Sequence, residues 1–121
     1  MGCGVEIAVM SDAVVKFPAG ARSRVAPPPP DHVTGLAAEE WHRVVAVLHE
    51  RGDLDAAILG TLESYAIHYE RWRQAEAHVR DYGLMVEAPR TGVPMENPNV
   101  SIANKAASMT LRLAKALQIL P

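Results

Sequence analysis

The sequence has little of what marks a secreted, membrane-bound or disulfide-rich protein. It contains one cysteine, Cys3, which excludes a disulfide within these 121 residues and is typical of a reducing cytoplasm. No apolar run approaches the roughly 20 residues of a membrane span, and the first residues lack the charged start of a secretory signal. Aromatic residues make up only 5% of the chain, so alanine and leucine carry much of the apolar content, which favours helix packing over sheet packing.

Motifs that carry chemistry are also missing. The string LHERG is not the HExxH of a metalloprotease, and RGDLDAAILG has neither the spacing nor the lysine of a phosphate-binding loop. The five histidines form no metal-binding motif, and Cys3 has no base beside it in the sequence. We therefore expect no catalytic residue, no metal ion, no cofactor and no enzymatic activity.

Acidic residues are absent from two stretches of the chain, residues 13–30 and 97–121, and each stretch carries three cations. These cations are Lys16, Arg22, Arg24, Lys105, Arg112 and Lys115. Such cations can contact DNA phosphates. The net charge of −2, in contrast, does not mark a nucleic-acid binder, and the basic ends can equally pair with the acidic middle of the chain. Both alternatives stay open at this point.

Four consecutive prolines, residues 27–30, divide the chain into two parts. Such a run favours an extended, stiff conformation. The strings VEIAVM and AVVKF before it are compatible with short strands or irregular turns. We expect an all-α fold with an irregular N-terminal arm over residues 1–30 and a helical oligomerisation domain over residues 31–121.

The string TGLAAEEWHRVVAVLHERG predicts a first helix. Thr34 suits the N-cap, and Gly52 can adopt the left-handed conformation that ends a helix. Five apolar residues recur on one face at helical spacing: Leu36, Trp41, Val44, Val45 and Leu48.

Two further helices are expected. One runs from a cap at Asp53 or Asp55 to about Tyr82 and would be roughly 42 Å long. A loop rich in proline and glycine follows Gly83, and the last helix begins with Asn97 as N-cap and Pro98 as its first residue. Apolar residues alternate at spacings of three and four in both helices, which predicts a long antiparallel hairpin. In the last helix this stripe comprises Ile102, Ala106, Met109, Leu113, Ala116 and Leu120, with the cations on the opposite side.

The apolar stripes of this hairpin are wide, and the first helix can cover only about half of its length. Exposed apolar surface of this extent usually marks an interface. We therefore expect a homo-oligomer, unless residues 1–30 fold back over the stripes. The expected interface residues are Ile58, Leu62, Tyr65, Tyr69, Trp72, Ile102, Met109 and Leu113.

Several landmarks resemble the phage terminase small subunit family, in its short helical type from tailed phages and prophages. They are APPPP, Leu36 and Trp41, GDL at 52–54, Tyr65 and Tyr69, Gly83, ENP at 96–98 and the closing LAKALQILP. The chain departs from the family pattern at Ile58, where an acidic residue is common.

The resemblance implies a non-enzymatic protein that assembles into a ring and binds double-stranded viral DNA in the cytoplasm of the bacterial host. It also implies regulation of the terminase large subunit, which carries the ATPase and nuclease. The residues themselves leave one alternative open, a helical protein-interaction or adaptor module that does not bind nucleic acid.

Overall fold

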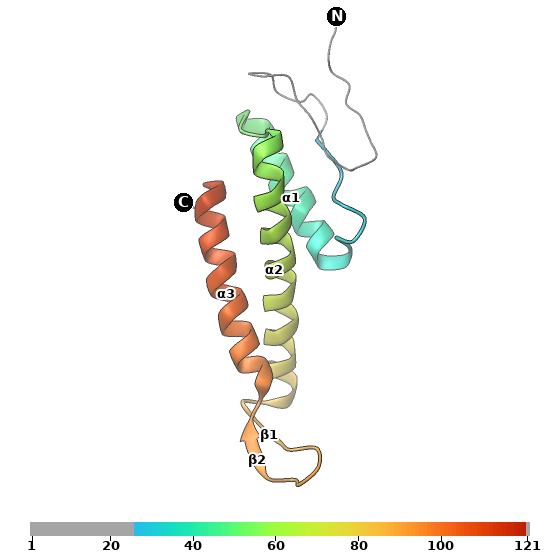
Figure 1. Ribbon diagram of the computed structural model, residues 1–121, viewed down its shortest axis with the longest axis vertical. Coiled ribbons are helices and arrows are strands. Elements are labelled where there is room, and N and C mark those ends of the chain that lie inside the picture. The colour runs from blue at the N-terminus through green and yellow to red at the C-terminus, as the bar shows by residue number, and fades with distance from the viewer. Residues whose placement is uncertain (1–25, 121) are drawn as a thin grey trace, which may run out of the picture.

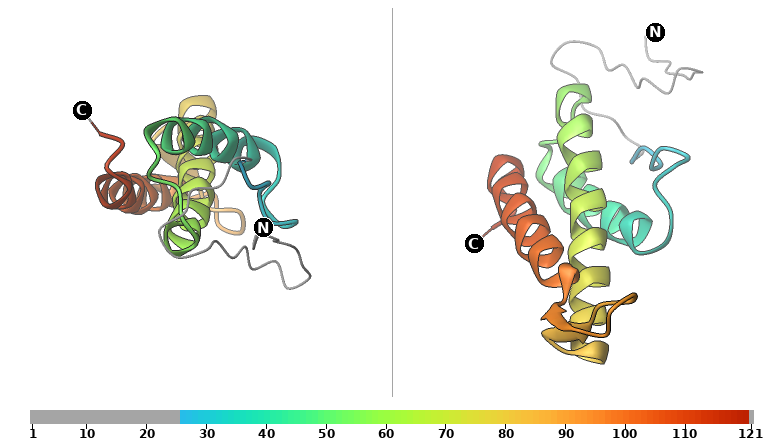
Figure 2. Two further views of the ribbon diagram at one scale, coloured as in Figure 1. Left: turned by 90° about the horizontal axis from the view of Figure 1, so that it is seen from above. Right: turned by 60° about the horizontal axis from the view of Figure 1, so that its bottom comes forward.

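The computed structural model describes residues 26–120. Its elements are α1 (Gly35–Arg51), α2 (Ala56–Tyr82), β1 (Met85–Glu87), β2 (Pro94–Glu96) and α3 (Pro98–Leu117). α2 and α3 run antiparallel with the short β-hairpin at their turn, and α1 crosses the half of α2 that lies nearer its N-terminus (Figure 1). Seen end on, α1 and α3 lie on different sides of α2 (Figure 2). The all-α fold with its helical hairpin is confirmed.

Local capping residues explain where the helices begin and end. The Asp55 carboxylate accepts hydrogen bonds from the N–H groups of Ala57 and Ile58 at the start of α2, which satisfies donors that have no partner within the helix. Gly52 ends α1 with a φ of 74°, a value that glycine adopts without strain. Thr34 occupies the N-cap position of α1, but its side chain makes no capping hydrogen bond.

The core lies at the end of the molecule where all three helices meet. The expected face of α1 is buried there, except for Leu36, which is half-buried. Leu54 from the α1–α2 connection, Leu62 from α2 and Leu117 from α3 complete this core. The proline segment also contacts it, because Pro27 is buried and its carbonyl accepts a 3.1 Å hydrogen bond from Trp41 Nε1.

The α2–α3 contact is built from small side chains, and here the expected stripe on α3 is displaced. The buried residues of α3 are Ala103, Ala106, Thr110, Ala114 and Leu117. Of the expected stripe, Ala106 is buried, whereas Ala116 and Leu120 are exposed and Ile102 keeps 43% of its surface. The helix is rotated because alanines let two backbones approach closely, whereas the larger side chains fit at the margin. At 20 residues, α3 is also shorter than the 27-residue α2.

The segment between α2 and α3 was expected to be a loop, but it contains a two-stranded antiparallel sheet. Met85 pairs with Glu96, Val86 with Met95, and Glu87 with Pro94. The turn between the strands includes Gly92, whose φ is 71°. The strands are held together by hydrogen bonds between residues that are separated in the sequence. Proline and glycine content is a local property, so it does not reveal this pairing.

Candidate nucleic-acid interface

A shallow depression runs between the middle of α2 and the first half of α3. His68 and Arg71 line it from α2. Ile102, Lys105 and Met109 line it from α3, together with the buried Ala106. A second shallow depression on α3 shares Lys105 and Met109 and adds Arg112. We call these two continuous depressions the cationic groove.

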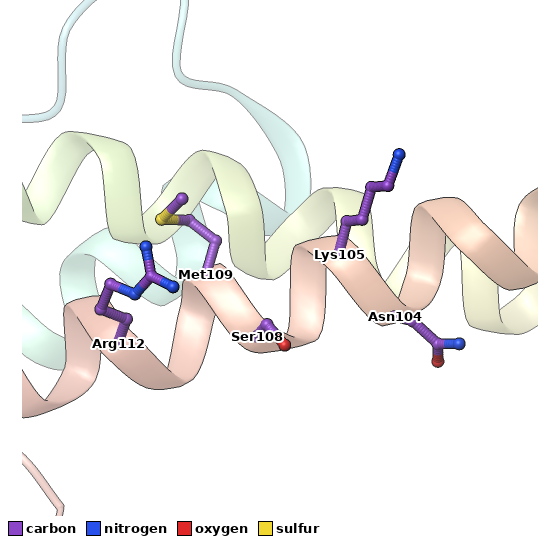
Figure 3. A pocket seen from close by; sticks show the side chains of 5 residues that line it. All are labelled: Asn104, Lys105, Ser108, Met109 and Arg112. Atoms are coloured by element: carbon purple, nitrogen blue, oxygen red, sulfur yellow. The ribbon is translucent and has the colours of Figure 1, made fainter.

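Helical spacing gathers these side chains on one side of α3. Lys105, Met109 and Arg112 are separated by four and three residues, so they lie above one another along the helix. In Figure 3, Lys105 and Met109 project from α3 on the side of α2, whereas Asn104 points the other way. The aliphatic part of this groove therefore lies between two cations of the same helix.

The electrostatics of the groove are one-sided. No aspartate or glutamate is among the residues that line either depression. Within residues 26–120, the salt bridges of arginine are Arg43 with Glu40 and Arg51 with Asp53, and none involves Arg71, Lys105 or Arg112. The three groove cations are all exposed to solvent. Such a surface attracts an anion.

His68 adds an imidazole ring to the groove. Its Nδ1 lies 2.8 Å from the backbone carbonyl of Ser64. A carbonyl can only accept, so Nδ1 carries the proton and donates this bond.

The structure brings together only some of the cations expected to bind DNA. Lys105 and Arg112 lie in the groove. Lys115 is exposed in the last turn of α3 and is not among the lining residues. Lys16, Arg22 and Arg24 lie outside the described residues.

Sequence reasoning missed His68 and Arg71, because both lie in the acidic middle of the chain. The signal that could have found them is the antiparallel pairing of the two helices. That pairing sets the middle of α2 beside the first half of α3, and therefore places residues 68–71 next to Lys105.

The residues expected at an oligomer interface occupy three environments. Leu62 and Tyr65 are 0% and 4% exposed within the chain's own core, so neither is available to a second copy in this structure. Half-buried residues at the margin of the core are Ile58, Tyr69 and Leu113, and Trp72 is half-buried beside Tyr69, with ring centroids 5.8 Å apart. Ile102 and Met109 line the cationic groove.

A buried polar cluster holds α1 on α2. The carboxylate of Glu40, which is 4% exposed, accepts a 2.6 Å hydrogen bond from the Tyr65 hydroxyl and two hydrogen bonds from Arg43. Burial alone would raise the pKa of Glu40, but the bonds from Arg43 and Tyr65 outweigh it and the pKa lies below its ordinary value. Burial and the Glu40 carboxylate raise the pKa of the Tyr65 hydroxyl. Both oxygens of the Glu40 carboxylate and the Tyr65 hydroxyl are paired inside the fold, so we assign the cluster to stability.

The described residues contain neither a metal-binding cluster nor a membrane-spanning helix. Within residues 26–120, no group of three histidine, cysteine, aspartate or glutamate side chains is placed to hold a metal ion. No helix in this part of the chain has both the length and the apolar character that crossing a bilayer requires.

Comparison with known proteins identifies the class to which this fold belongs. The model of the family described as "Phage terminase, small subunit" matches residues 37–121. The chain therefore belongs to the phage terminase small subunit family, and its role is in phage DNA packaging. Members of this family are generally non-catalytic regulatory subunits. Neither the curated proteins nor the solved structures gave a match.

Proposed function

We propose that this protein is the non-enzymatic small subunit of a phage DNA-packaging terminase. Several copies assemble, bind double-stranded viral DNA in the cytoplasm of the host, and regulate the large subunit that carries the ATPase and nuclease. The single observation that carries the DNA-binding part is the cationic groove, in which Arg71, Lys105 and Arg112 lie without an acidic neighbour among the lining residues.

The groove suits the phosphate backbone better than the base edges. Its cations come from two helices that lie side by side, so neither helix stands out far enough to enter a major groove alone. None of the aromatic residues lines it, so it offers no surface on which bases stack. Contacts of this type position a protein on DNA without reading the sequence.

Self-assembly is supported by apolar surface that α1 does not cover. Tyr69 and Trp72 are half-buried, and Arg73 lies over both rings at 5.6 and 5.9 Å from their centroids. A second copy that packed on these rings would bury them fully, as aromatic anchors are buried at the centre of interfaces. We place the interface on this aromatic pair and on Ile58 and Leu113. Ile102 and Met109 are assigned to the cationic groove and not to this interface.

The DNA-binding proposal is tested by removing the groove charges. The variant Arg71→Gln/Lys105→Gln/Arg112→Gln is compared with wild type on linear duplex DNA between about 50 and 200 mM salt. Each lost phosphate contact lowers the slope of log affinity against log salt by about 0.9, so three contacts lower it by about 2.7 for each engaged subunit. Light scattering should give an unchanged oligomer mass.

The matched control is Arg80→Gln, which removes an exposed cation of α2 that is not among the groove residues. We expect it to leave the slope nearly unchanged. The charge-reversed pair Lys105→Glu/Arg112→Glu should abolish retention of DNA in a low-salt gel shift. Unchanged retention would refute the assignment and would favour an adaptor that assembles without nucleic acid.

A further inference from the structure

The β-hairpin end of the molecule carries a second surface, distinct from the cationic groove. Five of the nine exposed large hydrophobic side chains of the described residues lie there, with 37% to 66% of their surface accessible. They are Tyr82, Leu84, Met85, Val93 and Met95. Exposed apolar side chains gathered at one end of a molecule favour an interaction site there. We call these five residues and the two strands the hairpin tip.

The two edges of this small sheet differ in what they can bind. Asn97 N–H donates to the Leu84 carbonyl and Ala88 N–H donates to the Val93 carbonyl, at 2.7 and 2.9 Å. In an antiparallel pair the hydrogen-bonded residues alternate with residues whose backbone groups point outward. Met85 and Glu87 therefore present N–H and C=O groups along the outer edge of β1. No hydrogen bond found within residues 26–120 uses these groups.

The outer edge of β2 is blocked. Glu96 and Pro94 are the residues opposite Met85 and Glu87, so they point outward from β2. Pro94 has no N–H to donate, and proline on an edge strand hinders further pairing. The outer edge of β1 thus keeps both of its outward N–H donors, whereas the outer edge of β2 lacks one of them.

This asymmetry argues against a second copy of the chain as the occupant of the tip. Copies arranged in a ring use head-to-tail contacts, in which two different surfaces meet. A ring built through the hairpins would have to pair β1 of one copy with β2 of the next, and Pro94 opposes that pairing. We therefore take the occupant to be a strand from a different protein.

The charge of the tip indicates the chemistry of this strand. Residues 81–97 contain three carboxylates, on Asp81, Glu87 and Glu96, and one guanidinium, on Arg90, which gives a net charge of −2. This sign repels DNA phosphates and attracts a cationic segment. The exposed methionine and leucine side chains can pack against an apolar segment, because flexible side chains adapt to different shapes.

We propose that the open edge of β1 binds an extended segment of a partner protein, apolar and bearing lysine or arginine, which adds to the hairpin as a third strand. Under the proposed function this partner is the terminase large subunit. The same chain then holds DNA in the groove between its helices and the large subunit at the hairpin tip.

The test replaces Glu87 by proline. Its N–H points away from β2, so proline removes an outward donor and leaves the cross-strand hydrogen bonds in place, as Pro94 does in the same register on the other strand. Binding of the purified large subunit to the full-length chain is measured by biolayer interferometry. We expect Glu87→Pro to weaken it about tenfold or more. The control Glu87→Ala keeps the N–H and should weaken it only slightly, with a smaller salt dependence.

Each result is informative. Equal weakening by both variants, or no weakening by Glu87→Pro, would overturn strand addition at β1. A lower oligomer mass for Glu87→Pro would also overturn it, because the hairpin would then join copies of this chain. A wild-type chain that does not bind the large subunit would remove the partner from both proposals, and an unchanged salt slope for DNA shows that the proline variant is folded.

Discussion

The Tyr65 hydroxyl provides the sharpest test of how α1 is held on α2. It donates a 2.6 Å hydrogen bond to the Glu40 carboxylate, and both side chains are only 4% exposed. The variant Tyr65→Phe removes one oxygen and leaves the ring, so it creates almost no cavity. Its effect therefore reports the hydrogen bond and little else.

The expected magnitude follows from the charge of the acceptor. A hydrogen bond to a charged group contributes about 1.5–3 kcal/mol. The Arg43 guanidinium still neutralises the carboxylate in the variant, so we expect a loss in the lower half of this range. About 95 residues unfold with an entropy of about 0.2 kcal/mol/K, and the full range then corresponds to a fall in Tm of about 7–15 °C.

Thermal and urea unfolding at one protomer concentration measure this loss, since the stability of an oligomer depends on concentration. The matched control is Tyr69→Phe. The Tyr69 hydroxyl accepts only a solvent-exposed hydrogen bond from Arg73, at 3.0 Å, so its loss should cost less than about 0.5 kcal/mol. Equal costs for the two variants would refute the view that the Glu40 cluster fastens the two helices.

Two further predictions concern buried polar groups. Asn97→Ala should destabilise the chain by about 1–2 kcal/mol in urea unfolding. The Asn97 side chain is 0% exposed, caps α3 and donates a hydrogen bond to the Gly83 carbonyl. A loss under about 0.5 kcal/mol would contradict this prediction. Stability should also fall at low pH. The pKa of Glu40 is depressed below 4.5, so its contribution is complete above that pH and is lost as the pH falls through the folded-state value. The difference in unfolding free energy between wild type and Glu40→Gln should shrink below about pH 4.5, and a constant difference would count against a charged, paired Glu40.

Helix ends and the general fold could be predicted because their signals are local. Asp55, Asn97 and Pro98 act on the residues next to them, and Gly52 takes its left-handed conformation without help from the rest of the chain. Such signals can be read directly from the amino-acid sequence. For the same reason, the length of α2 and its antiparallel return could be inferred without coordinates.

The rotation of α3 could not be predicted, because two stripes on it satisfy the helical period equally well. One contains Ile102 and Leu113, and the other contains Ala103 and Ala114. Only the shape of α2 decides between them. The β-hairpin and the cationic groove could not be predicted either, because both bring together residues distant in sequence. The register of α2 and α3 places Arg71 and Lys105 along one depression, and the register of β1 and β2 pairs Val86 with Met95.

The small side chains between α2 and α3 have a consequence for how substitutions affect the cationic groove. They determine how far apart the two helix axes lie, and so how far the positive charges of one helix stand from those of the other. Buried alanines of α3 thus set the spacing of the groove charges. Under the proposed function, a larger side chain at Ala103 would alter the fit to DNA without replacing any lysine or arginine.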